Sequence, residues 1–171
     1  MSPALPYLLG YPEAIHTQAA RALASGQLGP WLAQRYPEAH GVRSDAALYD
    51  YVGALKGRFL RNAPPLAKVR YDGKLQTVHQ ALGTHTRVAR VHGGRLCTKR
   101  EIRIATLFRV APEPFLQMIA VHELAHLREP EHDKAFYQLC RHMAPDYAQL
   151  ELDVRLYLTH LAADGAPLWT P

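Results

Sequence analysis

The chain has 171 residues, a formal net charge of +5 and an apolar content of 48%, a balance that favours a packed globular core and excludes intrinsic disorder. No stretch reaches the roughly 20 uninterrupted apolar residues of a membrane span, and the first twenty residues lack the basic start of a secretory signal. We therefore expect a cytoplasmic protein that folds without disulfides and has no membrane partner.

The first 65 residues predict a helical segment that packs on the remainder of the chain. A helix can begin at Pro12, and Gly26 and Gly29 are expected to interrupt the helical pattern. Between Asp45 and Asn62, apolar residues recur at spacings of three and four, which predicts an amphipathic helix with Asp45 near its N-cap.

A small, mostly antiparallel sheet is expected between Lys68 and Phe108. β-Branched residues mixed with Arg and Lys indicate short strands there, with turns near Asp72-Gly73, Gly83 and Gly93-Gly94. The pair of glycines is typical of a β-hairpin. The final strand, from Ile102 to Phe108, alternates in the manner of a half-covered strand.

Basic residues are concentrated in the segment 56–109. Thirteen Lys and Arg residues stand there against two acidic residues, Asp72 and Glu101. Such a block can attract a nucleic acid, a nucleotide or an acidic partner, and the alternative is a solvated face of the sheet.

Three further helices are predicted after Pro112. The first carries an apolar stripe from Phe115 to His126 and should end at Glu129-Pro130, because the residue before a proline avoids the α region. A short helix is expected from about His132 to Met143, and a longer one begins after Pro145.

The first of these helices contains the segment His122-Glu123-Leu124-Ala125-His126, which is the HExxH pattern. Residues four apart lie on one face of a helix, so the imidazoles of His122 and His126 can reach the same Zn²⁺ ion. Glu123 projects beside the metal and can accept a proton from water as a general base.

A catalytic zinc requires a third protein ligand and one open position, and His132 is the best candidate because it lies just past the expected turn at Glu129-Pro130. Nothing local selects a residue that would stabilise the transition state or orient a ligand. The downstream candidates for these roles are His142, Tyr147, Tyr157 and His160, with Asp146, Glu151 and Asp153 as further acceptors for the ligand imidazoles.

Other residues near these motifs have simpler interpretations. Phe136 and Tyr137 follow His132 closely and are most simply packing residues behind the third ligand. The spacing of His79, His85 and His92 matches no ligand pattern, so a polar loop or strand role is favoured over a second metal site.

The order of strand, Ala111-Pro112, the segment Met118 to Leu127, Glu131-His132 and Phe136-Tyr137 resembles the YgjP-like family of zinc metallopeptidases and, more distantly, SprT-like proteases. The resemblance implies a compact, zincin-like α+β fold with His122, His126 and His132 as zinc ligands and Glu123 as the catalytic residue. Residues 66–171 would form this core, and residues 1–65 would pack on it within one structural domain. Tyr137 replaces the family's tryptophan.

The leading hypothesis is a zinc-dependent metallohydrolase that hydrolyses peptide bonds in a peptide or protein substrate. Glu123 favours peptide chemistry. One alternative is a metal-dependent nucleotide or phosphoester hydrolase, since the basic segment 56–109 would attract phosphate. Another is a nucleic-acid-binding protein with a non-catalytic zinc, although structural zinc sites are usually closed by four protein ligands.

Overall fold

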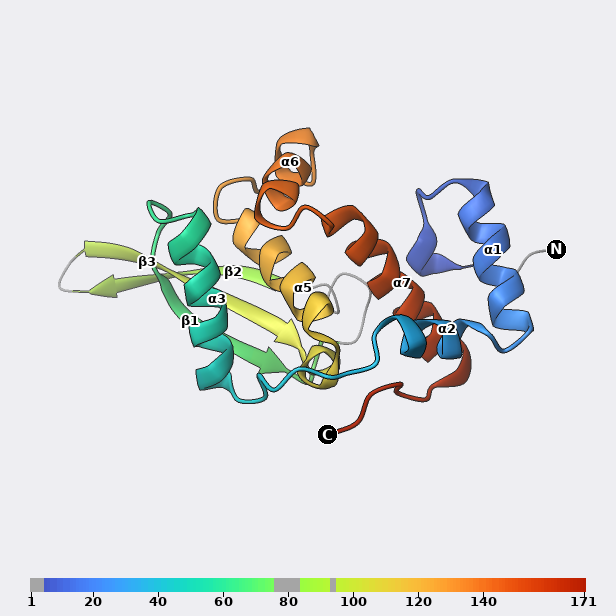
Figure 1. The fold of residues 1–171 in the computed structure, drawn as a ribbon. Helices are drawn as coiled ribbons and strands as arrows, with labels where there is room; N and C mark the ends of the chain where they lie inside the picture. Colours follow the sequence, from blue (N-terminus) through green and yellow to red (C-terminus); the bar gives the residue numbers. More distant parts are fainter. Residues whose placement is uncertain (1–4, 76–83, 93–94) are drawn as a thin grey trace.

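The computed structural model describes residues 5–75, 84–92 and 95–171. The described chain has the α+β class that the sequence predicts, with two short 3₁₀ helices beside its α-helices and strands (Figure 1). In chain order the elements are η1 (Pro6–Leu8), α1 (Glu13–Ala24), α2 (Leu28–Arg35), α3 (Asp45–Phe59), β1 (Leu66–Asp72), β2 (Thr84–His92), β3 (Arg95–Ala105), η2 (Thr106–Val110), α5 (Glu113–Ala125), α6 (Lys134–Met143) and α7 (Tyr147–Asp164). Among the described helices, none is long and apolar enough to cross a membrane.

The sheet is mixed, so the prediction of a mostly antiparallel sheet is wrong. Its strand order is β1-β3-β2. β2 pairs with β3 in the antiparallel sense, as the hairpin signal predicts, but β1 pairs with β3 in the parallel sense, with Val69 opposite Ile102 and Tyr71 opposite Ile104. β1 and β2 lie on opposite sides of β3, which is the central strand of the three.

Two further local predictions are corrected. The last strand does not reach Phe108, because β3 ends at Ala105 and the chain continues as η2, which buries Phe108 completely. Gly29 does not interrupt a helix but lies inside α2. A Cβ atom at Gly29 would stand 2.8 Å from Cε1 of His160, so the missing side chain allows α2 to approach α7 closely.

Helix α3 is fixed at its start by two side chains. Ser44 is the N-cap, next to Asp45 as the sequence predicts, and its hydroxyl accepts a hydrogen bond from the Ala47 backbone N–H at 3.0 Å. Asp45 instead accepts a hydrogen bond from the Tyr71 backbone N–H at 2.9 Å, which joins the helix to β1. Together these contacts hold α3 against the sheet.

Helix α5 is the centre of the molecule. Every residue from Phe115 to Ala125 is buried except Gln117, so the helix is covered on nearly all sides and is not the amphipathic surface helix that its sequence suggests. It packs on β3 and α3 on one side and on α6 and α7 on the other (Figure 1). The segment from His122 to Ala125 therefore lies in the core, and His126, at the C-cap of the helix, is partly buried.

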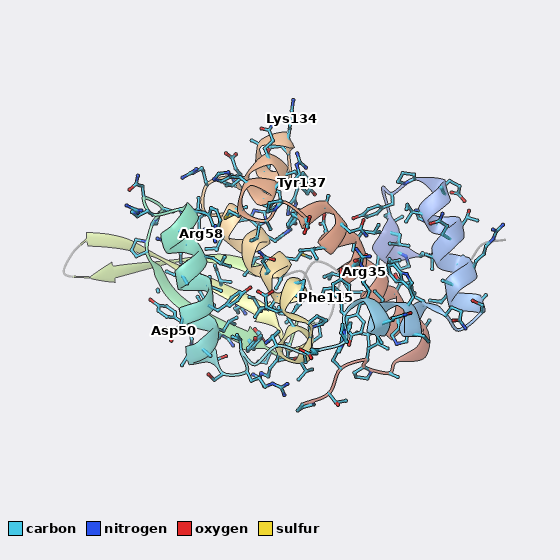
Figure 2. All side chains as sticks on the ribbon, in the orientation of Figure 1. Arg35, Asp50, Arg58, Phe115, Lys134 and Tyr137 are labelled. Atoms are coloured by element: carbon cyan, nitrogen blue, oxygen red, sulfur yellow. The ribbon has the colours of Figure 1, made fainter. Side chains whose placement is uncertain are left out.

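The two ends of the chain meet the start of α5 in an aromatic cluster. Phe115 contacts the rings of Tyr36, Tyr157 and Trp169 at centroid distances of 4.8–6.1 Å. In Figure 2, Phe115 lies between α5 and the neighbouring helices α2 and α7. Because buried aromatic rings contribute much of the packing in a core, this cluster ties the terminal helices to the element that carries the histidines.

Candidate metal centre

Three imidazoles converge at the C-terminal end of α5. The Nε2 atom of His122 lies 3.3 Å from that of His126 and 3.3 Å from that of His132, and the Nε2 atoms of His126 and His132 are 3.0 Å apart. These three residues form a cluster that could hold a metal ion, the only one found among the described residues. The structure thus brings together the three histidines that the sequence singles out.

The spacing of the three nitrogens fits a tetrahedral metal ion. Imidazole nitrogens at about 2.0–2.1 Å from zinc, separated by tetrahedral angles, would lie roughly 3.3–3.4 Å from one another. The observed separations of 3.0–3.3 Å are close to this value. Three neutral imidazoles cannot all donate hydrogen bonds within such a triangle, so a cation at its centre accounts for the arrangement better than hydrogen bonding does.

The chain between His126 and His132 is folded so that the third histidine returns to the first two. His126 closes the last turn of α5, and the Glu129 backbone N–H donates to the Ala125 carbonyl at 2.9 Å. The His126 Nδ1 lies 3.1 Å from the Glu129 carbonyl oxygen. An Nδ1–H donated to this carbonyl leaves the Nε2 lone pair of His126 free to bind a metal.

The third histidine stands immediately before a capped helix. Asp133 is the N-cap of α6, and its carboxylate accepts a hydrogen bond from the Phe136 backbone N–H at 3.0 Å. The sequence prediction starts this helix at about His132, whereas α6 begins at Lys134, after the Asp133 cap. An acidic residue followed at once by an apolar helical pattern is the signal that could have found it.

Phe136 forms a wall behind the three imidazoles. Its ring centroid lies 5.1, 4.6 and 4.9 Å from those of His122, His126 and His132, and its side chain is fully buried. Phe136 packs against His132, as the sequence predicts, and against the other two histidines as well. Tyr137 contacts Phe136 edge-on and lies partly buried between α6 and α7 (Figure 2).

His122 is the most buried of the three histidines, with 5% of its surface exposed. Its Nδ1 lies 2.8 Å from the Tyr147 hydroxyl at the start of α7. Burial, followed by the neighbouring imidazoles His126 and His132, lowers the pKa of His122 well below its usual value. His122 is therefore neutral near pH 7, the state in which an imidazole binds a metal.

Glu123 is almost completely enclosed, with 1% of its surface exposed. One carboxyl oxygen, Oε2, is buried without a hydrogen-bond partner among the described residues. Burial raises the pKa of this carboxyl well above its usual value. A buried carboxyl with an unsatisfied oxygen, one residue after a histidine of the cluster, is the kind of group that can accept and release a proton during a reaction.

Of the remaining candidates, Tyr147 is the one that contacts a histidine of the cluster, His122. His142 is exposed and meets Phe59 edge-on at 5.6 Å, whereas His160 is buried against Tyr157 and its Nε2 lies 3.0 Å from the Ala166 carbonyl oxygen. Asp146 is exposed on the surface, and the other two acidic candidates are paired with arginines, Glu151 with Arg155 and Asp153 with Arg35. His79 and the side chains of His85 and His92 lie outside the described residues.

The basic segment is partly used inside the fold. Arg70 pairs with Glu101 at 2.8 Å and Arg103 pairs with Asp72 at 3.2 Å, so both acidic residues of the segment are matched by arginines on neighbouring strands. Arg58 and Arg61 are exposed at the end of α3. The Arg58 guanidinium lies over the Phe59 ring at 4.8 Å, and Phe59 in turn contacts His142 on α6, so this basic end of α3 lies beside the helix that follows His132 (Figure 2).

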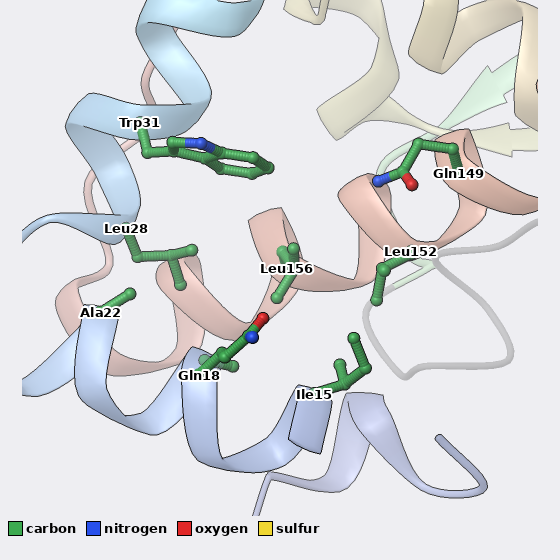
Figure 3. A pocket seen from close by; sticks show the side chains of 9 residues that line it. Ile15, Gln18, Ala22, Leu28, Trp31, Gln149, Leu152 and Leu156 are labelled. Atoms are coloured by element: carbon green, nitrogen blue, oxygen red, sulfur yellow. The ribbon is translucent and has the colours of Figure 1, made fainter. Parts of the chain in front are cut away.

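A groove of about 370 Å³ between α1, α2 and α7 lies apart from the histidines. Its lining is mainly apolar and includes Ile15, Leu28, Leu152 and Leu156, with Trp31 along one side (Figure 3). The lining contains neither the three histidines nor Glu123. The candidate chemistry therefore belongs to the end of α5 and not to this groove.

A helix-borne pair of histidines, a third histidine after a turn and a buried glutamate define a metal-binding site of the kind found in metal-dependent hydrolases. A family model described as "YgjP-like, metallopeptidase domain" matches residues 76–155. A relative from Escherichia coli (strain K12), named UTP pyrophosphatase, is 58% identical over 158 residues, which cover 92% of this chain and 95% of the relative. The chain belongs to the YgjP-like family. No solved structure matches it.

Proposed function

We propose that this protein is a zinc-dependent hydrolase of nucleoside triphosphates, with UTP as substrate and with UMP and pyrophosphate as products. The observation that carries the proposal is the 58% identity to a protein named UTP pyrophosphatase over nearly the whole of both chains. The sequence alone favours peptide hydrolysis, but this identity makes nucleotide hydrolysis the better-supported hypothesis.

Zinc is the proposed metal because three imidazoles with one open tetrahedral position are typical of catalytic zinc. When bound, the ion would act as a Lewis acid toward a phosphoryl oxygen and favour deprotonation of water. The residues of the chain supply the rest. His122, His126 and His132 hold the ion, and Glu123 accepts the proton of the attacking water.

The burial of Glu123 suits this role. A carboxyl with a raised pKa holds a proton more firmly than an exposed one, so Glu123 is a stronger base for water than an ordinary glutamate. It can then return the proton to the leaving pyrophosphate oxygen. The exposed Arg58 and Arg61 at the end of α3 would attract the polyphosphate through its negative charge.

The test is turnover of UTP by zinc-loaded protein, with products separated by ion-exchange chromatography. We expect UMP and pyrophosphate in equal amounts from the parent protein. Glu123→Gln should lower turnover by about a hundredfold or more, because general-base catalysis contributes roughly 10²–10⁴, while zinc remains bound. Glu129→Gln is the matched control, since the Glu129 side chain has no assigned role and its contact with His126 is made by the backbone. No UTP turnover by zinc-loaded parent protein would refute the proposal.

Peptide hydrolysis is the second candidate. The family description names a metallopeptidase domain, and a glutamate directly after the first histidine is the arrangement of HExxH peptidases. The same preparations assayed with a peptide library separate the two functions. Cleavage of peptides together with inactivity toward UTP would favour the peptidase, and the reverse result would favour the pyrophosphatase.

A further inference from the structure

The Tyr147 hydroxyl and the ligand His122 form a contact that nucleotide hydrolysis as proposed above does not use. Tyr147 is fully buried, and its hydroxyl lies 2.8 Å from Nδ1 of His122, the ring nitrogen that faces away from the other two histidines. The contact joins the first residue of α7 to α5 over 25 positions of sequence. We propose that Tyr147 is a positioning residue that fixes the tautomer and ring orientation of His122 for metal binding.

The direction of the hydrogen bond follows from the chemistry of imidazole. The Nε2 atom of His122 points to those of His126 and His132, so Nε2 must be the unprotonated nitrogen when a metal binds there. Nδ1 then carries the proton, and this Nδ1–H donates a hydrogen bond to the Tyr147 oxygen. A metal-bound histidine generally donates its second N–H to a carboxylate or a carbonyl oxygen. Here the phenol oxygen of Tyr147 takes the place of that acceptor.

The Tyr147 hydroxyl also has a partner on a second helix. The buried thiol of Cys140, on α6, interacts with the Tyr147 side chain. Burial raises the pKa of this thiol to about 12, so the sulfur stays uncharged near pH 7. The three buried side chains therefore form a connected line from α5 through α7 to α6. Burial of this kind keeps the hydroxyl away from substrate, which makes positioning the role that the geometry supports.

The other two histidines have different supports, so the contact between Tyr147 and His122 can be tested separately. His126 has the Glu129 backbone carbonyl as its partner, so no side-chain substitution removes that acceptor. His132 directly precedes Asp133, the N-cap of the following helix. For His122, Tyr147 is the side chain that supplies the acceptor, and removal of one oxygen atom is enough to test it.

The experiment compares zinc affinity in Tyr147→Phe and Tyr157→Phe by competition with a chromogenic chelator. Both tyrosines are buried on α7, but the Tyr157 hydroxyl interacts with the Leu168 backbone and not with a histidine. We expect Tyr147→Phe to weaken zinc binding by about 10–100-fold, as is typical when the partner of a metal-bound histidine is lost. Tyr157→Phe should bind zinc as the parent does. Equal affinity in all three proteins would overturn the proposal.

A second measurement needs no variant and so does not depend on the folding of Tyr147→Phe. In zinc-loaded parent protein labelled with ¹⁵N-histidine, His122 should show a protonated Nδ1 whose hydrogen exchanges slowly with water. A His122 that is unprotonated at Nδ1 would contradict the proposal. Neither measurement uses a nucleotide, so the proposal can fail while UTP hydrolysis stands, and UTP hydrolysis can fail while the proposal stands.

Discussion

Replacement of Phe136 by alanine tests whether the aromatic wall holds the three imidazoles in place. The ring is fully buried and lies within 5.1 Å, centroid to centroid, of all three histidines. Loss of a buried phenylalanine side chain costs about 3–5 kcal/mol of folding free energy. For a chain of this size, each kcal/mol lowers the melting temperature by about 2–4 °C, so Phe136→Ala should melt roughly 6–20 °C below the parent.

The matched control is Phe108→Ala. Phe108 is equally buried, but it belongs to η2 and makes no ring contact with a histidine among the described residues. Differential scanning calorimetry should show a similar loss of stability in both metal-free variants. Titration with zinc below both melting temperatures should show weaker binding, by about tenfold or more, only in Phe136→Ala. Equal zinc affinities in the two variants would refute the reasoning that the wall positions the ligands.

Three other predictions concern the supports of the site and of the sheet. Asp133→Ala removes the N-cap of α6, so it should lower the free energy of urea unfolding by about 1 kcal/mol and weaken zinc binding. Asp146→Ala should do neither, because the Asp146 side chain makes no cap hydrogen bond. Equal effects of the two substitutions would contradict this prediction. Excess chelator should lower the melting temperature of zinc-loaded parent protein, because a ligand at 100 times its Kd adds about 2.7 kcal/mol. An unchanged melting temperature would contradict the prediction that zinc binds to and stabilises the folded chain. The hydrogen bond from the Lys74 backbone N–H lowers the pKa of Asp72, so the Asp72 carboxylate stabilises the fold above its unfolded pKa and loses that effect as the pH falls through its folded pKa. Asp72→Asn should therefore lose less stability than the parent between pH 5 and pH 3. Parallel losses in the two proteins would contradict this prediction.

The metal site could be predicted because its geometry is mostly local. Two histidines four residues apart on a helix must share a face, and a turn before proline returns the third histidine within a few residues. Phe136 follows the same logic, since it lies on the next helix close to His132. For these residues, the sequence spacing alone determines which side chains can meet.

The role of Tyr147 could not be chosen from the sequence because it depends on how α7 packs against α5. His142, Tyr157 and His160 are equally suitable by residue type, yet their side chains end on the surface or in the aromatic core. The strand order has the same origin. A hairpin signal fixes the pairing of β2 with β3, but no local pattern states that β1 pairs in parallel with β3.

The burial of α5 shows a further limit of periodicity. A stripe at helical spacing predicts one covered face, but α3, the sheet, α6 and α7 together cover nearly the whole helix. The enclosure of Glu123 follows from that arrangement and not from its own neighbours in the sequence. The raised pKa of Glu123 therefore depends on tertiary packing and cannot be predicted from the sequence around it.

The central claim is that His122, His126 and His132 bind one metal ion. X-ray absorption spectroscopy on purified protein loaded with one equivalent of zinc measures the ligands directly. The account predicts three imidazole nitrogens at about 2.0–2.1 Å, with at least one of them lost in His132→Ala. Protein that remains free of zinc when the metal is offered, or a zinc shell that contains sulfur, would contradict it.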